Sequence, residues 1–149
     1  MSDRTTWHCS SSAGYCQSVQ LAANCIKARK RELAVQVSFA QQACMVQTRE
    51  GSVQARAGDA IVTGVYGEVW PIRADRFAEK YREATPGNYV SVPKQVLALK
   101  MDAPFSVVLA DGQSQLHGAA GDFLIAYQDG SLGIVAAHIF PVIYDIEAP

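Results

Sequence analysis

Apolar and polar residues alternate in short runs along most of the chain. In residues 33–39, Val35, Val37 and Phe39 alternate with small or polar side chains, the pattern of a strand with one buried face. Further strands are predicted at 44–47, 52–55, 60–65, 68–72, 94–101, 105–109, 113–117, 123–127, 132–135 and 143–146. Asp129-Gly130 is a strong two-residue hairpin signal between two of them. The pattern predicts an α+β, mainly β protein of short antiparallel strands.

Helical spacing is confined to three short stretches. Val19, Ala22 and Ile26 form a narrow apolar stripe that predicts a helix over residues 16–30, with basic residues at its C-terminal end. Residues 1–15 have little periodicity and are expected to form a loose arm before it. Short helices are also predicted at 73–81 and 136–140. We therefore expect an N-terminal helical extension on a β-rich body.

Residues 57–81, AGDAIVTGVYGEVWPIRADRFAEKY, recur in degenerate form as residues 120–144, AGDFLIAYQDGSLGIVAAHIFPVIY. Gly58 and Gly121 lie 63 positions apart, as do Phe77 and Phe140. Such a recurrence predicts two tandem β-rich repeats, which we expect to pack about a pseudo-twofold axis. We divide the chain into an arm and short helix at 1–28, a first repeat at 29–84, and a linker with the second repeat at 85–149.

Composition narrows the function classes. The 149 residues carry 13 basic and 14 acidic side chains, so the chain lacks the overall positive charge typical of nucleic-acid-binding proteins. No run reaches the roughly 18 apolar residues of a membrane span, and the first residues lack the apolar core of a signal peptide. We expect a cytoplasmic protein without a membrane partner, in which the four cysteines are free thiols.

The most distinctive polar group lies in the first copy only. Glu68 and Trp70 share one face of a predicted strand, Arg73 follows its end, and Tyr66 precedes it. An aromatic ring beside an acid and a base could stack on and hydrogen-bond a small planar or charged ligand. The simpler interpretation, which we favour, is a half-buried Trp beside a surface ion pair. Any ligand site at Tyr66, Glu68, Trp70 and Arg73 would be single, because the second copy lacks these groups.

Other candidate groups favour structural roles. Asp59 and Asp122 each follow a Gly in a turn, where a carboxylate typically accepts backbone hydrogen bonds. The potential metal ligands near the N-terminus, His8, Cys9, Cys16 and Cys25, lack a Cys-x-x-Cys spacing, so we expect no metal site.

The histidines and the basic residues do not form a recognised catalytic or nucleic-acid-binding motif. No nucleophile motif accompanies His117 or His138, so no catalytic residue and no cofactor are predicted. The basic run at residues 27–31 could contact phosphate, but a solvated helix end is the preferred interpretation, and nucleic-acid binding is not expected.

Several of these segments together resemble a family of small bacterial and phage proteins of unassigned function. Its members begin with a basic pair and an alternating strand, followed by segments like QTLEG, PGD, TG or KG, and GExYPVKPxxFxxTY. The counterparts here are residues 29–39, 47–51, 57–59, 61–64 and 67–73, with Phe77 and Tyr81. Ala57 and Ala74 stand where the family usually has Pro. The resemblance covers residues 29–83 and implies a β-rich module from a phage or mobile genetic element, with no assigned activity.

We expect a non-catalytic binding or assembly module that forms a homodimer or binds a protein partner. One alternative is a small-molecule-binding protein or enzyme with a cleft near Glu68, Trp70 and Arg73. The other is a weak nucleic-acid binder.

Overall fold

Short strands and tight turns make up most of the structure, as the alternating pattern predicts. The computed structural model describes residues 5–9 and 14–147. The chain divides into two compact units: unit 1 comprises residues 1–30 and 95–149, and unit 2 comprises residues 31–94. The α+β, mainly β class is confirmed, with antiparallel sheets and three short helices in the described residues. The division into tandem repeats and their pseudo-twofold relation stay predictions.

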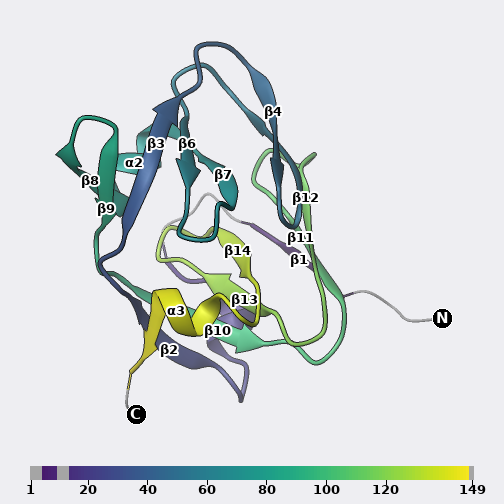
Figure 1. Ribbon diagram of the computed structural model, residues 1–149. Helices are drawn as coiled ribbons and strands as arrows, with labels where there is room; N and C mark the ends of the chain where they lie inside the picture. Colours follow the sequence, from purple (N-terminus) through teal and green to yellow (C-terminus); the bar gives the residue numbers. More distant parts are fainter. Residues whose placement is uncertain (1–4, 10–13, 148–149) are drawn as a thin grey trace. The chain divides into compact units, whose positions relative to one another are not determined.

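Unit 2 contains a five-stranded antiparallel sheet. Its strands are β3 (Ala34–Phe39), β6 (Ala60–Thr63), β7 (Val69–Ile72), β8 (Tyr81–Thr85) and β9 (Asn88–Ser91). They lie in the order β7-β6-β3-β9-β8, and helix α2 (Ala74–Lys80) connects β7 to β8 (Figure 1). A separate hairpin of β4 (Cys44–Thr48) and β5 (Gly51–Ala55) contacts β7.

The core of unit 2 forms on the face of the sheet that α2 covers. Val35, Val62 and Phe77 are buried there. The Phe77 ring stacks on Tyr81 at 5.6 Å and meets Tyr89 edge-on at 5.0 Å, distances at which aromatic pairs attract each other. The helix is only seven residues long, so packing of Phe77 rather than intrinsic helix propensity holds it in place.

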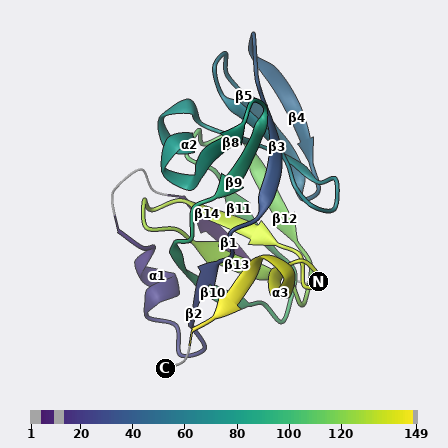
Figure 2. The same cartoon turned by 60° about the vertical axis from the view of Figure 1, so that its left-hand side comes forward.

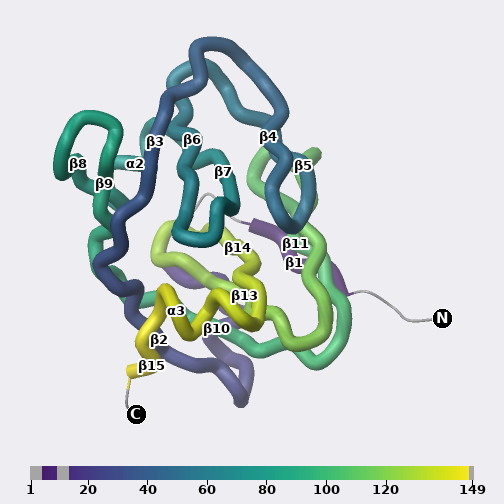
Figure 3. The backbone as a smooth tube through the Cα atoms, viewed as in Figure 1, coloured from purple at the N-terminus to yellow at the C-terminus, as the bar shows by residue number. Residues whose placement is uncertain are grey.

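Unit 1 contains a second five-stranded antiparallel sheet and a smaller three-stranded one. The larger sheet consists of β2 (Ile26–Lys30), β10 (Gln95–Lys100), β13 (Phe123–Ala126), β14 (Leu132–Val135) and β15 (Tyr144–Ile146), in the order β14-β13-β10-β2-β15. The smaller sheet consists of β1 (Thr5–His8), β11 (Phe105–Val108) and β12 (Gln115–Gly118), in which β1 is parallel to β11. Figure 3 follows the chain into β15, which lies beside β2.

The larger sheet of unit 1 is buried on both faces. On one face, Phe140 at the start of helix α3 (Phe140–Ile143) stacks on Phe123 and Tyr144. On the other, β10 contacts the single-turn helix α1 (Gln17–Gln20), which Figure 2 shows as a short purple coil. Because both faces of β10 are covered, consecutive residues are buried: Val96, Leu97, Ala98 and Leu99. This explains why β10 has an apolar run instead of strict alternation.

The two five-stranded sheets have the same strand order and the same registers. Val35 lies opposite Tyr89 in unit 2, and Val96 lies opposite Ala28 in unit 1. All but two partner pairs have a counterpart in the other sheet, displaced by 61 residues between β3 and β10 and between β9 and β2, and by 63 residues between the other strands. The two exceptions are Thr85 with Asn88 and Ala98 with Ile26. The strand in the place of β9 is β2, which comes from the N-terminal part of the chain.

The same carboxylate clamp occurs in both units. Asp59 accepts hydrogen bonds from the backbone N–H of Arg56 at 2.9 Å and of Ala74 at 3.1 Å. Asp122 makes the same pair of contacts with Ala119 and Ala137, at 3.0 and 3.1 Å. Each carboxylate thereby joins the turn before one strand to the segment that leads into the short helix. The predicted structural role of both residues is confirmed.

The N-terminal helix predicted over residues 16–30 is wrong beyond its first turn. Helix α1 ends at Gln20, and residues 26–30 form strand β2 in the middle of the larger sheet of unit 1. Of the predicted loose arm, residues 1–4 and 10–13 lie outside the described residues, whereas Thr5–His8 pairs with β11. Residues 85–88, predicted as a linker, are the turn between β8 and β9 within one sheet. Among the described residues, no helix has the length and apolar character to span a membrane.

The Asp59 carboxylate is buried, so its loss should destabilise the protein more than the loss of the Asp122 carboxylate. The Asp59→Ala substitution is expected to lower the free energy of unfolding by about 2 kcal/mol, because it leaves two backbone donors without their acceptor. Asp122 is only partly buried, so Asp122→Ala should cost less. Urea unfolding of both variants checks this order, and equal or reversed losses would contradict it.

Candidate functional site

The predicted ligand-binding residues lie at and after the turn that joins β6 to β7. The backbone N–H of Gly64 donates to the carbonyl of Glu68 at 2.9 Å, and that of Gly67 donates to Gly64 at 3.0 Å. Gly67 has φ of 77°, a conformation that other residues adopt at a cost. The Glu68 carboxylate accepts a hydrogen bond from the N–H of Tyr66 at 2.9 Å. The Glu68 side chain therefore stabilises the turn between β6 and β7.

Trp70 packs against the core of unit 2 and covers a glycine. It lies opposite Val62 in the β6–β7 pairing and contacts the buried cluster formed by that face of the sheet. A Cβ atom added to Gly64 would lie 3.0 Å from Cζ3 of Trp70 and 2.4 Å from Oε1 of Glu68. Gly64 is therefore the residue that lets the ring and the carboxylate approach the turn.

Arg73 forms its ion pair with a residue outside the Glu68, Trp70 and Gly64 group. It immediately precedes α2, and its guanidinium donates to the Asp75 carboxylate at 3.2 Å. Both side chains are exposed, so the ion pair adds little stability. The structure thus brings Glu68 and Trp70 together around Gly64, whereas Arg73 pairs with Asp75 in the first turn of the helix.

The equivalent turn of unit 1 has the ring on the opposite strand. Gly133 stands at the position of Trp70, and a Cβ atom added there would lie 3.1 Å from the hydroxyl of Tyr127, which stands at the position of Gly64. In both turns, an aromatic ring lies over a glycine diagonally across the hairpin. The sequence pattern shows no counterpart of Trp70 in residues 120–144, but in the structure Tyr127 packs over Gly133 as Trp70 packs over Gly64.

The two turns differ in what they expose. Val65 and Tyr66 are 50% and 52% exposed in the turn of unit 2. At the same positions, the turn of unit 1 has Gln128 and Asp129. Asp129 accepts hydrogen bonds from the N–H and hydroxyl of Ser131, so this turn is also held by a carboxylate. One turn therefore presents apolar side chains on a fixed backbone, and the other presents polar ones.

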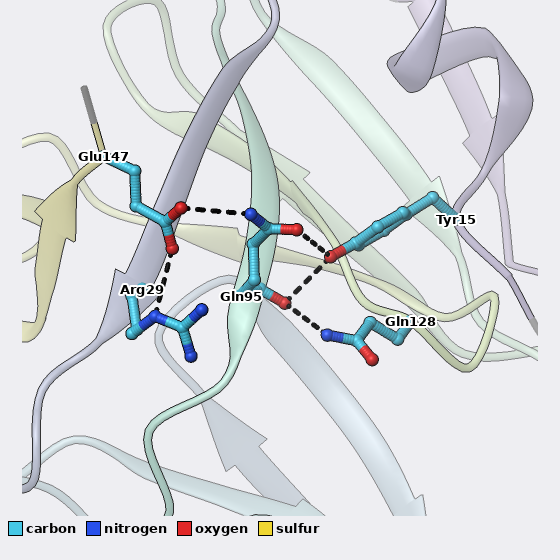
Figure 4. A network of polar contacts seen from close by, with 5 residues as sticks. All are labelled: Tyr15, Arg29, Gln95, Gln128 and Glu147. Atoms are coloured by element: carbon cyan, nitrogen blue, oxygen red, sulfur yellow. Dashed lines mark hydrogen bonds and ion pairs between the residues drawn. The ribbon is translucent and has the colours of Figure 1, made fainter. Parts of the chain in front are cut away.

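A polar network in unit 1 joins both ends of the chain to β10 (Figure 4). The hydroxyl of Tyr15 donates to Gln95 at 3.1 Å, and the amide of Gln128 donates to the Gln95 carbonyl at 3.2 Å. The Gln95 amide donates to one oxygen of Glu147 at 3.1 Å, and Arg29 donates to the other at 3.1 Å. Since every acidic and amide group has a partner inside the network, it favours a structural role.

Two other groups contain potentially reactive side chains. His117 Nδ1 lies 2.9 Å from the hydroxyl of Ser106, but Ser106 is buried at 3% exposure and has no access to a substrate. All four cysteines are free thiols. Within residues 5–9 and 14–147, no three His, Cys, Asp or Glu side chains gather where they could hold a metal ion.

A family model matches more than half of the chain. The family described as PGDYG protein matches residues 51–145, from the start of β5 to within β15. The chain belongs to the PGDYG protein family. The match includes residues 51–83 of the predicted resemblance and extends through the second Gly-Asp turn at residues 121–122. No curated protein and no solved structure matches the chain.

Replacement of Gly64 tests the packing of the turn. We expect Gly64→Ala to lower the free energy of unfolding by about 1–2 kcal/mol, because the added methyl group displaces the Glu68 carboxylate from the Tyr66 amide. The same substitution in a Glu68→Ala background should cost less, since only the contact with Trp70 remains. A double-mutant cycle measured by thermal or urea unfolding checks the coupling, and additive losses would contradict it.

Thiol reactivity tests the environment of the cysteines. Burial raises the pKa of the Cys9 thiol, and the Sγ atom also lies within hydrogen-bonding distance of Leu132, whose N–H is 3.2 Å away. Cys44 is exposed. At mildly alkaline pH, a thiol reagent should therefore label Cys44 first and Cys9 much more slowly. Mass spectrometry of the labelled peptides follows both rates, and faster labelling of Cys9 would contradict the structure.

Proposed function

We propose that this protein is a non-catalytic binding and assembly module, and that the partner of its β6–β7 turn is a second copy of the chain. The observation that supports the proposal is the exposed pair Val65 and Tyr66 on a turn whose backbone is fixed by Glu68 and Gly67. A fixed backbone lowers the entropy lost on binding, and tyrosine is enriched in protein interfaces. A contact between identical patches forms a closed dimer about a twofold axis.

Exposed apolar residues in unit 2 extend beyond the turn. Phe39 is 49% and Met45 is 63% exposed, so four of the six large apolar side chains exposed in the described residues belong to unit 2. The Phe39 ring packs edge-on against Phe77 at 5.6 Å, which limits its motion while half of it faces solvent. These residues favour unit 2 as the self-association surface.

The two alternatives would use groups that already have partners. A small molecule at Tyr66, Glu68, Trp70 and Arg73 would share the Glu68 carboxylate with the Tyr66 amide, which already donates a hydrogen bond to it. Binding of nucleic acid at residues 27–31 would use a strand in which Arg29 already pairs with Glu147 at 3.1 Å. The origin in a phage or mobile genetic element rests on the family resemblance alone.

We also infer that the two five-stranded sheets are copies of one repeat. Equal strand order, matched registers and the repeated Asp59 and Asp122 clamps support this duplication.

The dimer proposal is tested by exchanging the turn residues between the units. The wild-type protein should be a dimer in analytical ultracentrifugation at micromolar concentration. The double variant Val65→Gln, Tyr66→Asp carries the residues of the unit 1 turn and should weaken dimerisation by at least about tenfold, the effect of losing one interface anchor.

The control is Leu21→Asp, which removes a 74% exposed apolar residue in unit 1 and should leave dimerisation unchanged. A wild-type protein that stays monomeric at all concentrations would overturn the proposal. So would a dimer that tolerates the exchanged turn.

A further inference from the structure

We infer that the two repeats have exchanged their first strands, and that the dipeptides Arg31-Glu32 and Val92-Pro93 enforce the exchange because they cannot close a tight hairpin. The inference rests on the proposed duplication and is independent of the proposed dimer.

The exchange follows from chain order. Strand β2 is followed after three residues by β3, yet β2 pairs with β10 and β15 in unit 1. Strand β9 is followed after three residues by β10, yet β9 pairs with β3 and β8 in unit 2. Each sheet is thus completed by the strand that, along the sequence, begins the other repeat.

A closed alternative is defined by the same registers. Val35 lies opposite Tyr89, and Val96 lies opposite Ala28. If each first strand instead folded back on its own repeat, Ala28 would lie opposite Val35, and Tyr89 would lie opposite Val96. The strand registers of both sheets would be kept. The two forms would differ at the connecting residues and in the placement of Ala28 and Tyr89, which would exchange positions between the core of unit 1 and the aromatic cluster of unit 2.

Those connections would become two-residue hairpin loops, formed by Arg31-Glu32 and by Val92-Pro93. Such loops favour type I′ or II′ turns, which need a positive φ at the first loop residue and therefore favour Gly, Asn or Asp. Arginine adopts that conformation at a cost, and the β-branched Val92 is worse. In the structure, no described residue other than glycine has a positive φ, so neither connection has the backbone conformation that such a loop needs.

Ser91 stabilises the extended connection. Its hydroxyl donates to the carbonyl of Arg31 and accepts a hydrogen bond from the N–H of Leu33 at 2.8 Å. Its own N–H donates to the carbonyl of Leu33 at 2.9 Å. The Ser91 side chain is fully buried, so these bonds are shielded from water. The end of β9 therefore holds the chain that leads into β3.

The pairing can be tested by disulfide formation in the full-length protein with Cys9, Cys16, Cys25 and Cys44 changed to Ser. Residues directly opposite in an antiparallel pair have Cα atoms within disulfide range. The pair Val35→Cys, Tyr89→Cys reports the exchanged form, and Ala28→Cys, Val35→Cys reports the closed form. With the natural loops, only the first pair should cross-link on oxidation, as identified by mass spectrometry of the linked peptides.

The loop hypothesis is tested by changing Arg31-Glu32 and Val92-Pro93 to Asn-Gly. We expect the cross-links to reverse, so that the 28–35 pair forms and the 35–89 pair is lost. Alanine at the same four positions is the control, because it leaves no residue that favours positive φ and should keep the exchanged pairs. Circular dichroism and a cooperative thermal transition establish that each variant is folded.

Two results would overturn the inference. One is a 28–35 cross-link with the natural loops. The other is a folded Asn-Gly variant that keeps the 35–89 pair. A variant in which only Arg31-Glu32 is replaced provides the same readout if the fourfold variant does not fold, because closure of β2 on β3 displaces β9. None of these outcomes depends on whether the wild-type protein dimerises.

Discussion

The central strands β3 and β10 each need a hydrogen-bonding neighbour on both edges, and most of the fold follows from this requirement. Backbone N–H and C=O groups that are buried without hydrogen-bond partners lower the stability of the fold. If no strand paired with the second edge of β3 or β10, the backbone groups of that edge would be left without partners. Strand β6 pairs with one edge of β3, and β13 pairs with one edge of β10, each after an intervening hairpin that belongs to another sheet. The other edge is filled by β9 in unit 2 and by β2 in unit 1. The N-terminal part of the chain is therefore integral to the sheet of unit 1.

The sequence predicts most of the strands because alternation is a local signal, but it does not predict β1, β2, β8 or β9. Val35 and Val37 face the core as their spacing requires, and the turns at Gly67 and Gly130 have the positive φ that glycine favours. The carboxylates of Asp59 and Asp122 also act as their position after glycine predicts. These features depend on residues close in sequence.

Features that depend on distant residues were mispredicted. Ile26 lies with Ala28 on the buried side of β2, but the spacing of Ile26 from Val19 and Ala22 also fits a helix. Residues 26–30 form a strand because they pair with the edge of β10, almost 70 residues away in the sequence. Likewise, the proximity of Glu68 and Trp70 is readable from alternation, whereas their closeness to Gly64 requires the cross-strand register. Tertiary pairing overrides local pattern in both cases.

The ring and glycine pairs constrain how these turns can change over evolutionary time. Trp70 lies over Gly64, and Tyr127 lies over Gly133, so the ring and the glycine occupy opposite strands in the two hairpins. A single substitution cannot convert one arrangement into the other. It passes through either two rings that collide or two glycines that leave the core uncovered and the hairpin weakened. In related sequences, the two positions of each turn should therefore vary together, with the summed side-chain volume held nearly constant while its location changes.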